Sequence, residues 1–162
     1  MPAHEQLVHG ESLCSIDERF RLAMPPELAG PLGLADGDCW LVKERPGALS
    51  LWPSSASEAD QFAASLELVQ QKMRLGRLRD RTEQLMVLGR LLSTRRAEVK
   101  VDGRHRLTLP KGFREFLGVE AGGQVYVVGA ALCIEIWRPD AWIQYVEEHM
   151  PDFRKLFEEL ST

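Results

Sequence analysis

Two short stretches of the chain share one pattern of charged side chains, an aspartate followed at fixed spacing by two arginines. They read Asp17-Glu-Arg-Phe-Arg21 and Asp102-Gly-Arg-His-Arg106. A guanidinium group offers five donors in a rigid fork, which suits a phosphate or the O6 and N7 atoms of guanine. If the stretches are extended, the two arginines of each point to the same side. The pattern therefore predicts binding of an anion or a nucleic acid through Arg19 with Arg21, and through Arg104 with Arg106.

The same spacing also allows a purely structural interpretation. Asp17 with Arg21, and Asp102 with Arg106, can form internal ion pairs that hold a turn, and spacing alone does not decide between the two interpretations. They are compatible, because an aspartate can hold one arginine in place while the other reaches outward. His105 stands between two arginines, where it can contact phosphate or simply be exposed.

Both stretches belong to an internal repeat. A shift of 85 residues lays 11–57 on 96–142 without a gap. In this register Leu22 falls on Leu107 and Trp52 on Trp137, and the matched prolines and glycines follow the same order. Each copy has fewer than 50 residues, too few for a good core of its own. We therefore expect the two copies to share one core as an intramolecular pseudo-dimer.

The residue pattern of each copy predicts the same order of strands and helices. Alternating apolar residues indicate a first strand, a proline opens a short helix that a glycine ends, and two further strands form a hairpin. The expected strands cover 8–16, 39–43 and 48–52 in the first copy and 97–101, 125–129 and 132–137 in the second; the expected helices cover 26–32 and 110–117.

A helical connection joins the copies. Apolar residues from Phe62 to Met73 recur on one helix face, Gly76 ends that helix, and Asp80 is expected to cap the next one. A further helical region runs from 139 to 159, interrupted at Pro151. The predicted organisation is a first repeat, a helical connection, a second repeat and a helical tail, with bounds 1–57, 58–94, 95–142 and 143–162.

Composition limits the classes of function. The 162 residues are 44% hydrophobic and 27% charged, which excludes a wholly disordered chain. The three cysteines are far apart, so neither a disulfide framework nor a zinc motif is expected. Phosphate-loop, GxSxG and GxGxxG motifs are absent, so we expect no enzyme, metal or cofactor. With no signal-peptide pattern and no apolar run long enough for a bilayer, we expect a cytoplasmic protein without a membrane partner.

Charge is distributed unevenly. The net charge of −4 argues weakly against nucleic-acid binding, but residues 58–96 carry eight basic and five acidic side chains, a net +3. A local basic patch can bind an anion on an acidic molecule. The basic run is either a second phosphate patch or a solvated helix face; it comprises Lys72, Arg74, Arg77, Arg79 and Arg81.

The paired motifs, the proline four residues after each second arginine and the closing Leu51-Trp52 and Ile136-Trp137 pairs resemble the MraZ family. Its halves belong to the AbrB-like group of DNA-binding domains. The resemblance covers nearly the whole chain. It implies an α+β fold in which two AbrB-like units form a double-split, swapped-hairpin β-barrel. It also implies a homo-oligomeric ring that binds direct repeats in its own promoter region and represses the division and cell-wall gene cluster, in the cytoplasm at the nucleoid.

By the same resemblance, Arg21 and Arg106 match the arginines that contact DNA, and Asp17 and Asp102 match the motif aspartates. Lys100 is a further candidate for DNA contact, beside Arg19 and Arg104. The family usually has glycine before the second arginine, where this chain has Phe20 and His105. If that glycine needs a positive φ, the backbone there is strained. The alternative function is an AbrB-like scaffold or antitoxin-like module that does not bind DNA specifically.

Overall fold

The structure, a computed structural model, describes residues 6–162, so the first five residues of the predicted first repeat lie outside it. Strands and short helices alternate in each repeat, and longer helices follow each repeat. In chain order the elements are β1 (Val8–Ser15), β2 (Arg21–Ala23), α1 (Pro26–Ala29), the 3-10 turns η1 (Gly30–Leu32) and η2 (Leu34–Asp36), β3 (Asp38–Arg45), β4 (Ala48–Pro53), α2 (Ser57–Arg74), α3 (Thr82–Arg95), β5 (Arg96–Lys100), β6 (Arg106–Thr108), α4 (Lys111–Leu117), β7 (Gln124–Ala131), β8 (Ile134–Trp137), α5 (Pro139–His149), η3 (Met150–Asp152) and α6 (Phe153–Ser161).

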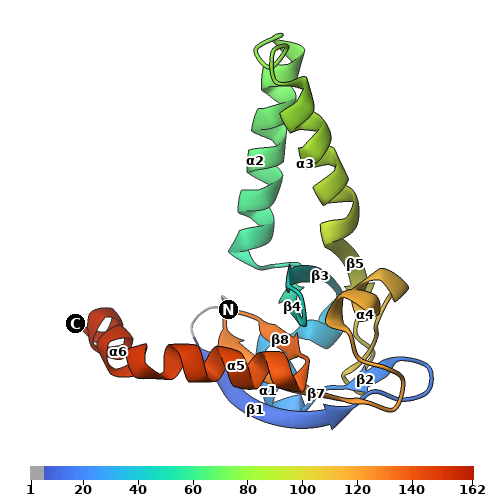
Figure 1. Cartoon of the computed structure of the whole chain (residues 1–162), viewed down its shortest axis with the longest axis vertical. Helices are drawn as coiled ribbons and strands as arrows, with labels where there is room; N and C mark the ends of the chain where they lie inside the picture. The colour runs from blue at the N-terminus through green and yellow to red at the C-terminus, as the bar shows by residue number, and fades with distance from the viewer. Residues whose placement is uncertain (1–5) are drawn as a thin grey trace.

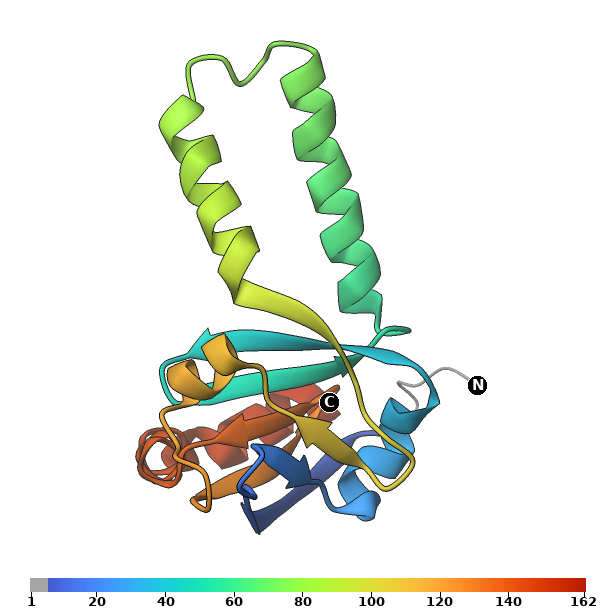
Figure 2. The same cartoon turned by 90° about the vertical axis from the view of Figure 1, so that its right-hand side faces the viewer.

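Six strands form one antiparallel sheet in the order β1-β7-β8-β4-β3-β5 (Figure 2). The first strand of each repeat pairs with the hairpin of the other repeat, because β1 lies against β7 and β5 lies against β3. The two hairpins meet in the middle of the sheet through β4 and β8. The repeats are therefore interlaced, since each completes the other's side of the sheet.

The remaining strands, β2 and β6, pair with each other in a second, two-stranded antiparallel sheet. Single bridges join this sheet to the ends of the large one, Ile16 with Leu22 and Val101 with Leu107. The resemblance implied a double-split barrel. The structure shows a mixed α+β fold with mostly antiparallel sheet, and in residues 6–162 the ladder does not close into a barrel, because β1 and β5 remain its edges.

One hydrophobic core holds side chains from both repeats, as the short length of each repeat predicted. Its largest fully buried members include Leu22 and Leu107, which the repeat places at equivalent positions. Other fully buried members come from both hairpins: Leu41, Leu49, Leu51, Val125, Ile134 and Ile136. Burial of these side chains requires both repeats. The core therefore holds the small β2–β6 sheet in place only when both repeats are present.

The short helices end as the sequence predicts. Pro26 occupies the first helical position of α1, and Pro110 caps the start of α4. Gly33 follows η1 with φ 63°, and Gly118 follows α4 with φ 77°. These are left-handed conformations that glycine adopts without a Cβ clash, so the helices stop there.

Helices α2 and α3 project from the body as an arm, and α5 with α6 extends sideways as a tail (Figure 1). Gly76, at φ 71°, follows the end of α2 as predicted. The expected cap at Asp80 is wrong. The carbonyl of Arg81 accepts the N–H of Leu85, so helical bonding starts there, and α3 has no side-chain cap. The predicted break at Pro151 is confirmed by η3, which separates α5 from α6.

Candidate nucleic-acid interface

The two charged motifs meet on one small antiparallel sheet. We call it the arginine ribbon: strands β2 and β6 with the turns 17–20 and 102–105 that precede them. Leu22 pairs with Leu107 at its centre, and both side chains are fully buried. Because side chains alternate across a strand, the flanking residues face outward. That outward face carries Arg21 opposite Thr108 and Arg106 opposite Ala23.

Each turn is held by its aspartate. The Oδ1 atom of Asp17 accepts the backbone N–H groups of Arg19 and Arg21 at 2.8 and 2.9 Å. Its Oδ2 atom accepts Nε of Arg21 at 2.7 Å. Asp102 makes the same three contacts in the second repeat, to the N–H groups of Arg104 and Arg106 and to Nε of Arg106, at 2.8, 3.0 and 2.9 Å. The ion pairs of the structural interpretation are therefore present in both repeats.

The residue before each second arginine has the positive φ that a glycine would favour. Phe20 lies at φ 57° and His105 at φ 60°. Their carbonyls cross-link the turns, because the carbonyl of Phe20 accepts the N–H of Leu109 and that of His105 accepts the N–H of Met24, both at 2.9 Å. The phenyl ring of Phe20 also lies under the guanidinium of Arg114, 3.9 Å from the ring centroid. These contacts offset the cost of the left-handed backbone.

Hydrogen bonding lowers the pKa of both motif aspartates below the ordinary value of 3.8. The largest cause is the backbone N–H of the following motif arginine, Arg21 for Asp17 and Arg106 for Asp102, while partial desolvation opposes it. The arginine side chain also lowers the pKa in each case. Both aspartates are therefore ionised at neutral pH and keep the turns closed.

The arginines of the ribbon divide into two kinds. Arg21 and Arg106 are bound through Nε but remain 39% and 38% exposed. Their terminal nitrogens have no hydrogen-bond partner among residues 6–162. Arg19 and Arg104 are exposed, and within the described chain their guanidinium groups have neither a hydrogen bond nor an ion pair. The ribbon thus presents two fixed and two free guanidinium groups.

Lys100, the remaining predicted candidate, lies at the end of β5 rather than on the ribbon. Its Nζ atom forms a long ion pair, 3.9 Å, with Oδ1 of Asp38, and the side chain is 85% exposed. Two ribbon neighbours were not found from the sequence. Thr108 lies on the outward face opposite Arg21, and Arg114 contacts Phe20. The Leu22–Leu107 match at the centre of the repeat is the signal that could have indicated this pairing.

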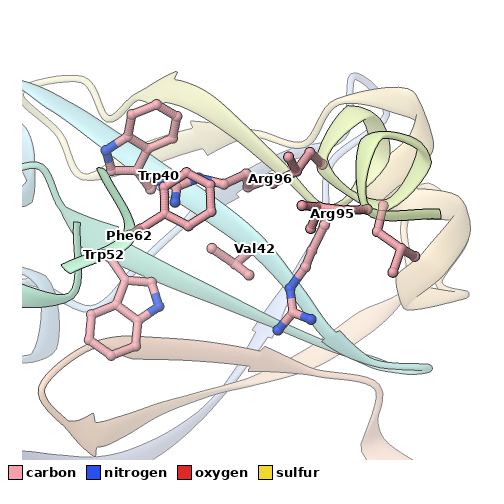
Figure 3. A pocket seen from close by; sticks show the side chains of 9 residues that line it. Trp40, Val42, Trp52, Phe62, Arg95 and Arg96 are labelled. Atoms are coloured by element: carbon pink, nitrogen blue, oxygen red, sulfur yellow. The ribbon is translucent and has the colours of Figure 1, made fainter. Parts of the chain in front are cut away.

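A second basic region lies at the base of the arm, around an apolar pocket (Figure 3). The guanidinium of Arg96 is sandwiched there, 4.0 Å from the centroid of the Trp40 ring and 3.8 Å from that of Phe62. Burial lowers the pKa of this guanidinium, and its Nε atom has no hydrogen-bond partner among the described residues. Arg96 is therefore part of the packing between arm and sheet, whereas Arg95 stays exposed.

The described residues include no cluster of three or more His, Cys, Asp or Glu side chains that could hold a metal ion. Of the helices in residues 6–162, none has the length and hydropathy needed to cross a membrane.

Comparison with known proteins connects this geometry to a family. A family described as "MraZ protein, putative antitoxin-like" matches residues 94–161. A protein of Treponema denticola named "Transcriptional regulator MraZ" is 27% identical over 151 residues, which cover 93% of this chain and 95% of the relative. Another of that name, from Shewanella sp., is 28% identical over 158 residues, covering 96% and 94%. One from Acetivibrio thermocellus is 37% identical over 49 residues, covering 30% and 33%. The chain is thus similar to proteins named MraZ along nearly its whole length, and the MraZ family model matches its second repeat and tail.

Proposed function

We propose that this chain is a transcriptional regulator that binds double-stranded DNA with the outward face of the arginine ribbon. The observation that carries the proposal is the meeting of both motifs on one ribbon, with Arg21 and Arg106 on the same face and Arg19 and Arg104 unpaired beside them. The name that the full-length relatives share supports the regulatory role.

The shape of the ribbon suits the major groove. That groove is about 12 Å wide and admits a two-stranded β-ribbon. Arg21 and Arg106 are already held at Nε by an aspartate, so they lose little side-chain freedom on binding. Each keeps its terminal nitrogens for a guanine edge or a phosphate oxygen. In this proposal these two arginines read bases, while Arg19, Arg104 and Lys100 contact phosphates.

One ribbon is small, so a single copy binds weakly. We propose that copies assemble into a homo-oligomeric ring, whose ribbons meet direct repeats in the protein's own promoter region. Joined ribbons then gain affinity through effective concentration. Bound there, the protein represses the division and cell-wall gene cluster and associates with the nucleoid. The Ile16–Leu22 and Val101–Leu107 bridges, in this proposal, complete the double-split barrel that supports the ribbon.

The test is fluorescence anisotropy with a duplex from immediately upstream of the protein's own gene and a scrambled duplex. A specific arginine contact contributes about 1–3 kcal/mol of discrimination. Arg21→Ala and Arg106→Ala should therefore each weaken binding to the native duplex by roughly tenfold. Arg19→Ala and Arg104→Ala should weaken binding to both duplexes and make it less sensitive to salt, because they remove phosphate contacts.

Arg90→Ala is the matched control. Arg90 is an exposed arginine on α3, 3.6 Å from Glu83, and lies outside the ribbon. It should leave both affinities unchanged. Equal binding of native and scrambled duplexes, with the Arg21→Ala and Arg106→Ala variants behaving like wild type, would contradict the proposal.

A second candidate function is a protein-interaction or antitoxin-like module that does not bind DNA specifically. The large apolar side chains exposed on the arm and tail favour it, because such surfaces mark interaction sites. The anisotropy experiment separates the two functions, since an interaction module shows no preference for the native duplex.

A further inference from the structure

Helix α6 carries an apolar stripe that is mostly exposed; in the described chain, only its first members, Phe153 and Leu156, border residues of α5 and η3. Phe153, Leu156, Phe157 and Leu160 follow the i, i+3, i+4, i+7 spacing of one helix face. All four are more than half exposed, with Leu160 at 80%. An isolated helix of nine residues is marginal in water. A stripe this complete on so short a helix indicates that α6 packs against another surface.

The base of the arm offers an apolar hollow. A pocket of about 410 Å³ opens between the two arm helices and the sheet (Figure 3). This volume lies in the range of pockets that take ligands of many heavy atoms, so it has room for large side chains. The pocket is lined by Trp40, Val42 and Trp52 from the sheet, Phe62 from α2, Leu88, Leu91 and Leu92 from α3, and the stems of Arg95 and Arg96.

The tail is anchored away from the pocket of its own chain. The ring of Trp142 on α5 packs against buried Trp137, with centroids 5.2 Å apart, and its Nε1 atom donates to Glu11 at 2.7 Å. From this anchor α6 runs sideways, away from the arm (Figure 1). An occupant of the pocket that resembles α6 must therefore come from a second copy of the chain.

The two surfaces also carry opposite charge. Two basic side chains, Arg95 and Arg96, line the pocket, and the described residues that line it include no acidic side chain. The tail, residues 143–162, has two basic and five acidic side chains, a net −3. Opposite charges around apolar centres steer two surfaces together and fix their register.

We propose that α6 of one copy inserts its apolar stripe into the arm pocket of a second copy. Because tail and pocket are different surfaces, the contact is head-to-tail, and repetition of it closes a ring or extends a filament. The inference rests on the proposed function for the ring itself, and it adds the surface that joins the copies.

The test uses the full chain without DNA, by size-exclusion chromatography with light scattering. Phe157→Asp on the stripe and Leu91→Asp in the pocket should each raise the concentration needed for assembly at least tenfold. Leu68→Asp is the matched control. Leu68 is 52% exposed and Leu91 54%, but Leu68 lies about 120° round α2 from the pocket residue Phe62. Leu68→Asp should assemble like wild type.

A mixture tests the head-to-tail geometry. Phe157→Asp keeps an intact pocket and Leu91→Asp keeps an intact tail. In an equal mixture, the tail of a Leu91→Asp copy can therefore enter the pocket of a Phe157→Asp copy, while the reverse contact is disrupted. The mixture should therefore give heterodimers, while each variant alone is monomeric. Because all three substituted side chains are exposed, circular dichroism should match wild type; Leu160→Asp repeats the stripe test if one variant does not fold.

Three results would overturn the inference: a monomeric wild type, assembly of Phe157→Asp or Leu91→Asp at wild-type concentrations, or a mixture that stays monomeric. Dissociation by Leu68→Asp would also contradict it, because the effect would not depend on the pocket. The ribbon variants separate this inference from the proposed function. Arg21→Ala with Arg106→Ala should lose DNA binding and still assemble, whereas Phe157→Asp should lose assembly and still bind a single-site duplex weakly.

Discussion

Asp17 and Asp102 stand beside arginines that the proposed function assigns to DNA, and this proximity has two consequences. Each carboxylate offsets part of the positive charge that a phosphate would meet. Each also accepts two backbone N–H groups of its turn, and this fixes the direction of the following arginine. Fixed direction matters more for reading a base than for contacting a phosphate, because a bidentate contact depends on the orientation of the guanidinium plane.

The lowered pKa values of these aspartates make turn stability depend on acidity. A carboxyl group whose pKa is lower in the folded than in the unfolded chain stabilises the fold when the pH is above its pKa in the unfolded chain. That contribution is lost as pH falls below about 3.8 through the lowered folded value. In urea unfolding at pH 6, wild type should have a higher free energy of unfolding than Asp17→Asn/Asp102→Asn, and the difference should be at its full size. The difference should shrink as pH falls below 3.8; a constant difference down to pH 2 would contradict this.

The left-handed backbone at His105 predicts that glycine is better there. A left-handed conformation costs a non-glycine residue about 1–2 kcal/mol, which glycine avoids. Glycine also makes the unfolded chain more flexible, and this lowers the stability of the fold by about 0.4–1 kcal/mol. His105→Gly should therefore raise the free energy of unfolding by about 0.5–1 kcal/mol in urea titrations. His105→Ala, which keeps the strain, is the control and should not gain. Phe20→Gly should gain less than His105→Gly, because it also removes the ring beneath Arg114. A His105→Gly protein less stable than His105→Ala would sink this explanation.

At the scale of elements, one side chain from the start of β5 packs between the arm and the sheet. Arg96 stacks on Trp40 of β3 and on Phe62 of α2. Its Nε atom is buried without a hydrogen-bond partner among the described residues, and the two ring faces stabilise the half-buried guanidinium. The direction in which α2 leaves the body thus depends on this sandwich.

Arg96→Ala should therefore loosen the arm. A cation–π contact is worth about 0.5–2 kcal/mol, and this substitution removes two of them. We expect thermal unfolding at lower temperature and faster amide hydrogen exchange in the first turns of α2. Arg96→Met keeps most of the apolar stem and removes the unpaired Nε, so it should restore much of the stability. Arg95→Ala, at the exposed neighbour, is the control for both measurements. Unchanged exchange in α2 for Arg96→Ala would show that other contacts hold the arm.

The sequence was most informative where local chemistry decides the structure. Prolines and glycines predicted both short helices, and alternating apolar residues predicted the strands, because backbone sterics act within a few residues. It was least informative where distant contacts decide. The pairing of β2 with β6, which places Arg21 and Arg106 on one face, depends on contacts across 85 residues. The start of α3 was misplaced because the turn after Gly76 runs to Arg81 and displaces the cap expected at Asp80.

At the scale of the whole molecule, interlacing makes the two repeats depend on each other. The large sheet contains strands of both repeats in mixed order, and the arginine ribbon takes one strand from each. A ribbon with two equivalent halves can meet two similar half-sites, as a dimer of separate proteins would. Here the two halves differ in sequence. In the alignment of the repeats, Glu18 corresponds to Gly103 and Phe20 to His105. In the proposed function, the chain can therefore favour one orientation on DNA, which suits direct repeats better than inverted ones.

Interlacing also predicts how the body unfolds. Leu22 and Leu107 pair at the centre of the ribbon and are both fully buried in the shared core. Truncating a buried leucine to alanine costs about 2–5 kcal/mol. Leu22→Ala and Leu107→Ala should each lower the stability of the whole body by a similar amount. Trp52 lies in the first repeat and Trp137 in the second. Versions that keep only one of these two, with the other three of the four tryptophans changed to Phe, report the repeats separately by fluorescence. Both reporters should show one common urea midpoint in each leucine variant, because neither repeat can keep its core without the other. Two separated midpoints, with only the mutated repeat shifted, would show that the repeats fold as independent units.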